Sequence, residues 1–114
     1  MQDALFRLPE PAPEHAVIAR FELGGDDFGE PDQWSLVFGT ERVMGAAVKA
    51  AGVGEVDGNE FGGGEFVIFA YGPDAEALYR AMEPGLRALP FRPAHVVLRY
   101  GEATDNVASE RIEL

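Results

Sequence analysis

The segment that most constrains the fold is EFVIFAY, residues 65–71, because both of its alternating faces are apolar. A strand of this kind must be covered on both sides, which is typical of a central strand. Residues 16–23, AVIARFEL, place apolar residues at every second position and predict a strand with one buried face. Residues 95–100, HVVLRY, predict another strand, and the polar segment VGEVDGNEF, residues 53–61, is typical of an edge strand. The sequence therefore predicts a sheet with residues 65–71 inside it.

Two helices are expected between these strands. Residues 75–89 follow Asp74, which is placed to cap a helix, and they carry four apolar residues on one helical face: Leu78, Met82, Leu86 and Leu89. Pro84 is expected to bend this helix, because proline removes one of its hydrogen bonds. Residues 31–51 predict a second helix from about residue 40. Its first part, residues 31–39, contains a β-like aromatic run, although an initial proline favours helix there as well.

The order of these elements, β-α-β-β-α-β, predicts an α+β protein of ferredoxin-like fold. Such a fold has one antiparallel sheet, usually in strand order 4-1-3-2, with both helices on a single face. We expect one domain over residues 16–101. Residues 1–15 hold three prolines at alternate positions and predict an extended arm. Residues 102–114 are expected to form a tail or an additional edge strand.

The charge of the chain limits its partners. It has 20 acidic and 9 basic residues among 114, which gives a net charge of −11. This balance repels nucleic acids and anionic lipid surfaces, whereas it attracts a basic protein or a cation. The chain has no cysteine, which excludes disulfides and cysteine-based sites. It shows no signal peptide and no apolar run long enough to span a membrane, so we expect a cytoplasmic protein without membrane association.

The predicted topology gathers acidic residues at one end of the sheet. The loop after the first strand, the glycine turn at residues 62–64 and the segment at residues 89–93 should meet there. The candidates for binding a basic partner at this end are Asp26, Asp27, Glu30, Asp32, Glu60 and Glu65. The acidic loop lacks the ligand spacing of a calcium loop, so we predict no metal site. The three glycines precede a strand rather than a helix, which predicts a hairpin turn and not a phosphate cradle.

The sheet face away from the helices is expected to carry large apolar groups together with Arg20, His95 and Arg99. An exposed apolar patch usually marks an interface. The three basic residues would suit a small anion, or they would lie in a homodimer interface. In a third alternative, this face is covered by the N-terminal arm, residues 1–15, or by the C-terminal tail, residues 102–114.

Catalytic constellations have little support. The serines are Ser35 and Ser109, and the histidines are His15 and His95. The two histidines begin antiparallel strands and should lie at opposite ends, so no Ser-His-Asp arrangement is expected. We predict no cofactor and favour a non-enzymatic role. An enzyme of the dimeric ferredoxin-like barrel type, using His95 and Tyr100, stays open as an alternative.

Residues 52–88, GVGEVDGNEFGGGEFVIFAYGPDAEALYRAMEPGLRA, resemble a group of small bacterial proteins that share the glycine turn, the aromatic strand and the YGPDA step into a helix. The resemblance supports a ferredoxin-like fold and implies no activity or catalytic residue. Charge clustering without a catalytic constellation predicts an interaction module that binds a basic partner through its acidic end, as immunity proteins bind basic toxins. The alternative is a small-ligand-binding or regulatory domain that dimerises through the open sheet face.

Overall fold

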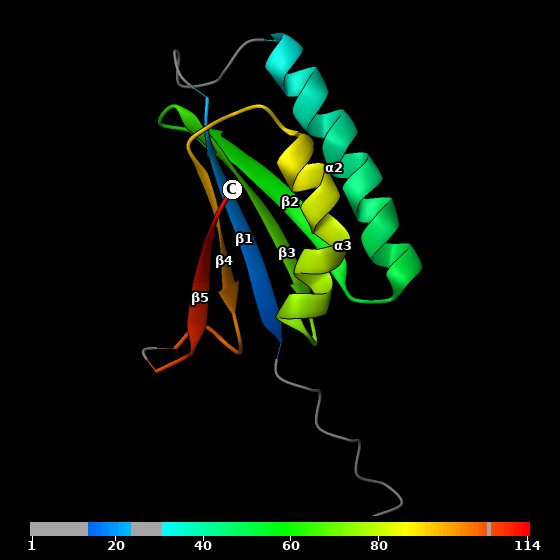
Figure 1. Cartoon of the computed structure of the whole chain (residues 1–114), viewed down its shortest axis with the longest axis vertical. Coiled ribbons are helices and arrows are strands. Elements are labelled where there is room, and N and C mark those ends of the chain that lie inside the picture. Colours follow the sequence, from blue (N-terminus) through cyan, green and yellow to red (C-terminus); the bar gives the residue numbers. More distant parts are fainter. Residues whose placement is uncertain (1–13, 24–30, 105) are drawn as a thin grey trace, which may run out of the picture.

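A computed structural model describes residues 14–23, 31–104 and 106–114 of the chain (Figure 1). In chain order the elements are β1 (His15–Glu22), α2 (Pro31–Ala51), β2 (Glu55–Gly62), β3 (Glu65–Gly72), α3 (Ala75–Ala88), β4 (Ala94–Arg99) and β5 (Ser109–Glu113).

The five strands form one antiparallel sheet in the order β2-β3-β1-β4-β5. Both helices pack on the same face of this sheet, and no described residue covers the other face (Figure 1). The predicted α+β class is therefore confirmed. The chain departs from a strict β-α-β-β-α-β order, because the C-terminal residues add β5 beside β4.

β3 lies inside the sheet between β2 and β1, as its two apolar faces predicted. Its residues Phe66, Val67, Ile68 and Ala70 are buried. Phe66 stacks on Phe21 of β1 with ring centroids 4.8 Å apart, and Phe91 meets Phe66 edge-on at 5.7 Å. Stacked and edge-to-face pairs of this kind add to the stability gained from burying the rings. This aromatic group fills the core at the end of the sheet where β1 ends and β3 begins.

α3 follows its sequence pattern closely. Leu78, Met82 and Leu86 are buried at helical spacing. Oδ1 of Asp74 accepts hydrogen bonds from the backbone N–H groups of Glu76 at 3.0 Å and Ala77 at 3.2 Å, so it caps the helix as predicted.

α2 is helical over its full length, including residues 31–39. Val37, Met44 and Val48 are buried and lie on one side of the helix. This spacing overrides the β-like composition of the first turns, because a helix places Val37 in the same core as Met44.

The glycine turn closes the hairpin between β2 and β3. Gly62 pairs with Glu65, and the two residues between them have positive φ angles, 60° at Gly63 and 77° at Gly64. A two-residue loop with positive φ at both positions matches the twist of the flanking strands and strongly favours glycine. The prediction of a hairpin turn is confirmed.

Candidate functional site

Three connecting segments meet at one end of the sheet. The backbone N–H of Leu23, after β1, donates to the carbonyl oxygen of Gly64 at 2.8 Å. The N–H of Glu22 donates to the carbonyl oxygen of Pro93 at 3.0 Å. These bonds join the end of β1, the glycine turn and the α3–β4 connection, as the topology predicted. We call this region the acidic end, and its described carboxylates are those of Glu22, Asp32, Glu60 and Glu65.

The six acidic candidates have different surroundings. Asp26, Asp27 and Glu30 lie outside the described residues. Glu65 forms an ion pair with Arg20, with Nη1 and Oε1 3.1 Å apart. Asp32 and Glu60 are exposed and pair with no basic side chain in the described part of the chain.

Two arginines close to the acidic end are already engaged. Arg87 donates to Glu83 at 2.7 Å. Nη1 of Arg92 donates to the carbonyl oxygens of Leu89 and Phe91, each at 2.7 Å. These contacts stabilise the end of α3 and the turn after it. Neither Arg87 nor Arg92 forms an ion pair with Glu60.

The uncovered sheet face has an apolar centre. Ile18 on β1 pairs with Phe69 on β3 and with Val97 on β4, and all three side chains are half-buried. Large apolar groups were expected on this face. These three residues occupy it because the other alternating positions of the same strands are buried under the helices.

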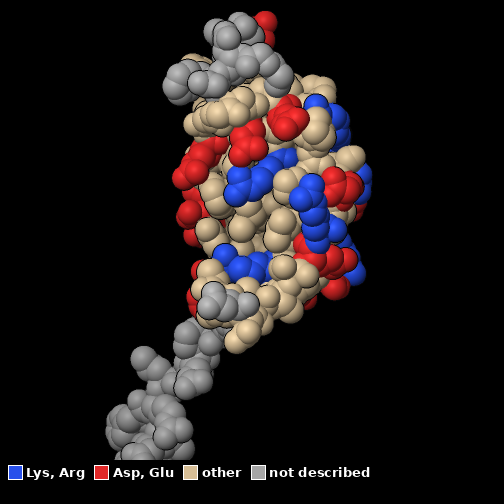
Figure 2. All heavy atoms as spheres, turned by 90° about the vertical axis from the view of Figure 1, so that its left-hand side faces the viewer, with Lys and Arg blue, Asp and Glu red and all other residues tan. Residues whose placement is uncertain are grey.

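Charges of both signs lie on this face. Figure 2 shows acidic groups along one border and at one end, and acidic and basic groups side by side towards the other border. β2, the strand at that border, carries the exposed Glu55, Asp57 and Glu60. The inner and opposite strands carry Arg20, Arg99, Arg111 and His95.

The predicted basic trio is not gathered at one point. Arg20 pairs directly with His95, whereas Arg99 lies four residues farther along β4, roughly 13 Å away at the rise of a strand. There Arg99 donates to the carbonyl oxygen of Gly101 at 2.9 Å. Arg111 of β5 takes its place beside His95.

Arg20, His95 and Arg111 line a hollow of about 160 Å³ together with Glu65 and Glu113. Burial lowers the pKa of His95, the cation of Arg111 lowers it further, and Glu113 opposes this shift. The imidazole is therefore mainly neutral at pH 7. Both arginines already pair with carboxylates, Arg20 with Glu65 and Arg111 with Glu113. An anion bound here would have to displace those carboxylates.

His15 lies at the opposite end of the sheet from His95, as predicted. Its Nδ1 accepts a hydrogen bond from the N–H of Ala75, at 3.0 Å, and its ring meets Tyr100 edge-on. This histidine anchors the first turn of α3. No group of three His, Cys, Asp or Glu side chains that could hold a metal occurs among the residues described. No described helix is long and apolar enough to cross a membrane.

Sequence reasoning missed an apolar surface on α2. The exposed fractions are 39% for Trp34, 42% for Leu36, 45% for Phe38 and 70% for Val43. Trp34 and Phe38 meet Phe61 of β2 edge-on, with centroids 6.1 and 5.9 Å apart. The sequence did contain a sign of this surface, because the large apolar residues of α2 cover more of the helix than one buried stripe. The residues outside that stripe are the ones that stay exposed.

Comparison with protein-family models, curated proteins and solved structures gave no match. The resemblance of residues 52–88 to small bacterial proteins stays a prediction.

Proposed function

We propose that this protein is a non-enzymatic interaction module that binds a basic protein partner through the acidic end and the adjoining outer edge of β2. The observation that carries the proposal is a row of unpaired carboxylates along an open strand. Glu55, Asp57 and Glu60 are exposed on β2 and form no ion pair with any described residue. Within the described residues β2 hydrogen-bonds to β3 alone, so its other backbone edge can accept a strand.

The open edge suggests how the partner binds. An extended segment can add to a sheet through main-chain hydrogen bonds, while its alternate side chains give specificity. A segment with lysine or arginine at every second position would place these cations opposite the carboxylates of β2. Acidic residues on an edge strand also prevent pairing with unsuitable chains. The same carboxylates would therefore select a basic segment and reject neutral or acidic ones.

We further propose that the fold is a ferredoxin-like one, extended by β5. Support comes from the adjacency of β4, β1, β3 and β2 and from the two helices on one face. In this arrangement the added strand occupies one edge of the sheet and leaves β2 as the other.

The test uses a ten-residue peptide that alternates lysine with threonine. Calorimetric titration should detect binding that weakens steeply as salt rises, because salt screens exposed charges. A control peptide with proline replacing threonine keeps the charge but cannot form the strand hydrogen bonds, and it should bind more weakly.

Two charge-matched variants locate the site. Glu55→Gln with Glu60→Gln should weaken peptide binding several-fold. Glu14→Gln with Glu102→Gln removes two exposed carboxylates elsewhere and should have little effect. Equal losses in both variants would mean that net charge alone attracts the peptide, and the proposed site would be rejected. Binding without salt dependence would also reject it.

A second candidate is a ligand-binding or regulatory homodimer formed through the open sheet face. It is favoured by the apolar centre at Ile18, Phe69 and Val97, which no described residue covers. Sedimentation should then detect a dimer that Val97→Asp dissociates, and a monomer at high concentration would exclude this candidate.

A further inference from the structure

A hollow of about 290 Å³, which we call the β2 hollow, lies between α2 and β2. Its wall on β2 consists of Val56 and Asn59. The α2 residues that line it follow the spacing i, i+3, i+4 and i+7 and therefore form one side of the helix: Phe38, Glu41, Arg42 and Gly45. Since β2 is the outer strand of the sheet, this hollow adjoins the edge at which the proposed partner segment would be added.

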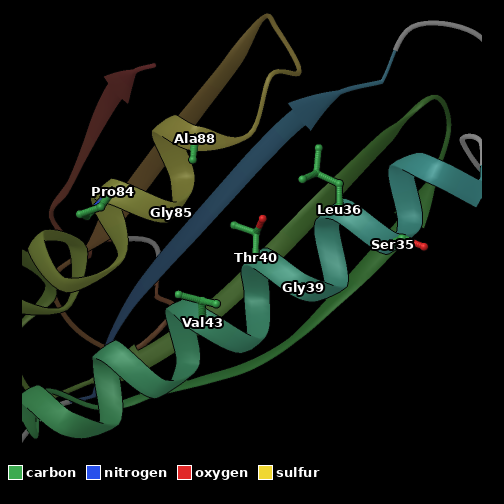
Figure 3. Close-up of a pocket in the computed structure, with 8 residues that line it drawn as sticks. All are labelled: Ser35, Leu36, Gly39, Thr40, Val43, Pro84, Gly85 and Ala88. Carbon is green, nitrogen blue, oxygen red and sulfur yellow. The ribbon is translucent and has the colours of Figure 1, made fainter.

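The other side of α2 faces α3. There Leu36, Thr40 and Val43 lie opposite Pro84 and Ala88 across a groove of about 440 Å³ (Figure 3). The two sides of α2 are therefore different surfaces, and the β2 hollow lies on the side that α3 does not cover.

Gly45 keeps the β2 hollow open. A Cβ at this position would lie 4.0 Å from Cβ of Val56, which is an ordinary contact distance, so an alanine would fit there. Within a helix glycine is also less favourable than alanine. The packing of α2 on β2 therefore does not require a glycine, and its effect is to leave space above Val56 unfilled.

The groups around the β2 hollow favour an apolar occupant. The ring of Phe38 is 45% exposed. The carboxylate of Glu41 already accepts a hydrogen bond from Asn59, and Arg42 forms no ion pair with any described residue. The charges of Glu41 and Arg42 offset each other, so the hollow has no net attraction for a charged side chain. An apolar side chain would instead cover the exposed ring of Phe38.

A strand added to β2 would have different surroundings on its two faces. Val56, Asn59 and Phe61 lie on the helix side of β2, because they pair with three buried residues of β3. Glu55 and Glu60 pair with intervening positions of β3 and lie on the open sheet face. Every second side chain of the added strand would therefore lie beside the β2 hollow, and the others would lie beside the carboxylates.

We propose that the partner segment is an amphipathic β-strand in which lysine or arginine alternates with large apolar residues, one of which inserts into the β2 hollow beside Gly45. This inference rests on the proposed function and specifies the helix-facing side of the same segment. The hollow also sets the register, because a shift by one residue would place cations in the hollow and apolar groups against Glu55 and Glu60. A second copy of this chain is a poorer occupant, because two β2 strands would bring like charges together.

The experiment compares two ten-residue peptides by calorimetric titration. The first alternates lysine with threonine, and the second differs only in having leucine in place of its central threonine. The leucine peptide should bind about tenfold more tightly, as partial burial of a leucine side chain predicts. Threonine favours a strand, so this gain cannot come from strand propensity. Equal affinities would overturn the inference and leave the proposed function standing, whereas no binding of either peptide would overturn both.

Two matched glycine variants locate the leucine. Gly45→Leu fills the β2 hollow and should bring the two peptides to similar affinities. Gly39→Leu makes the same change on the side of α2 that faces α3 (Figure 3), where a Cβ would meet no heavy atom within 4 Å, and should preserve the tenfold difference. A difference that survives in Gly45→Leu, or that both variants lose equally, would overturn the inference.

Two further measurements complete the test. The thermal midpoint confirms that each variant is folded, and Phe38→Ser, at an exposed position, should also reduce the difference between the peptides if Gly45→Leu does not fold. Glu55→Gln with Glu60→Gln should weaken both peptides alike, because these carboxylates lie on the other face of the added strand. In sedimentation, a dimer that Gly45→Leu dissociates would mean that a second copy fills the hollow, and it would overturn the inference.

Discussion

Gly54 connects α2 to β2 at a place where only glycine fits. Its φ angle is 139°, and a Cβ there would lie 2.2 Å from the carbonyl oxygen of Tyr71 and 2.9 Å from Cα of Gly72. Gly72, on the facing segment, is equally restricted, since a Cβ there would lie 2.2 Å from the carbonyl oxygen of Val53. The two backbone segments therefore pass in contact, and neither can move without displacing a strand end.

The size of the effect of Gly54→Ala follows from two costs. Holding a non-glycine residue in a sparsely populated backbone region costs about 1–3 kcal/mol. Forcing an extra methyl group into a packed site costs roughly another 1–3 kcal/mol through backbone shifts. The free energy of unfolding should fall by about 2–6 kcal/mol, a large part of the roughly 5–15 kcal/mol typical of a domain.

Urea unfolding followed by far-UV circular dichroism measures this change. With a slope of about 1.5 kcal/mol per molar urea, a loss of about 3 kcal/mol lowers the midpoint by about 2 M. Gly62→Ala is the matched control, because a methyl group on Gly62 would meet no heavy atom within 4 Å and the residue has no positive φ. If Gly54→Ala and Gly62→Ala gave the same midpoint, the close approach of the two backbone segments would be refuted.

The remaining predictions concern α3 and Tyr100. Met82→Ala should cost about 2–5 kcal/mol in chemical unfolding, because Met82 is fully buried; a loss under about 1 kcal/mol would contradict its place in the core. Asp74→Ala should cost about 0.5–2 kcal/mol, because two backbone donors lose their cap; an unchanged midpoint would contradict the cap. A hydrogen bond to Glu110, aided by burial and the Glu110 charge, raises the pKa of Tyr100 to about 12. The folded state then holds this proton more tightly, so the stabilisation is complete below about pH 10 and is lost as the pH rises towards about 12. Glu110→Gln should move the Tyr100 titration, read by tyrosinate absorbance, back towards about 10, and no movement would exclude Glu110 as the cause.

The sequence by itself determined the features that depend on local spacing or backbone conformation. EFVIFAY had to lie inside a sheet, because each of its faces needs cover. The spacing of Leu78 and Met82 placed one face of α3 in the core, and two adjacent glycines with positive φ closed the β2–β3 hairpin. The alternation of apolar residues also predicted large apolar groups on the sheet face away from the helices, where Ile18 and Val97 lie.

Tertiary structure decided where distant segments compete for burial or partners. α2 became helical through its first turns because Val37 reaches the core, and this left Leu36 and Val43 exposed beside α3. The pairing of β5 with β4 brought Arg111 close to His95, although the two residues are 16 positions apart in the sequence. Local spacing specifies which face of a helix is apolar. In α2 this apolar face is wider than the surface that the sheet and α3 cover. Only the packing of α2 against α3 and the sheet determines which part of this apolar surface stays exposed.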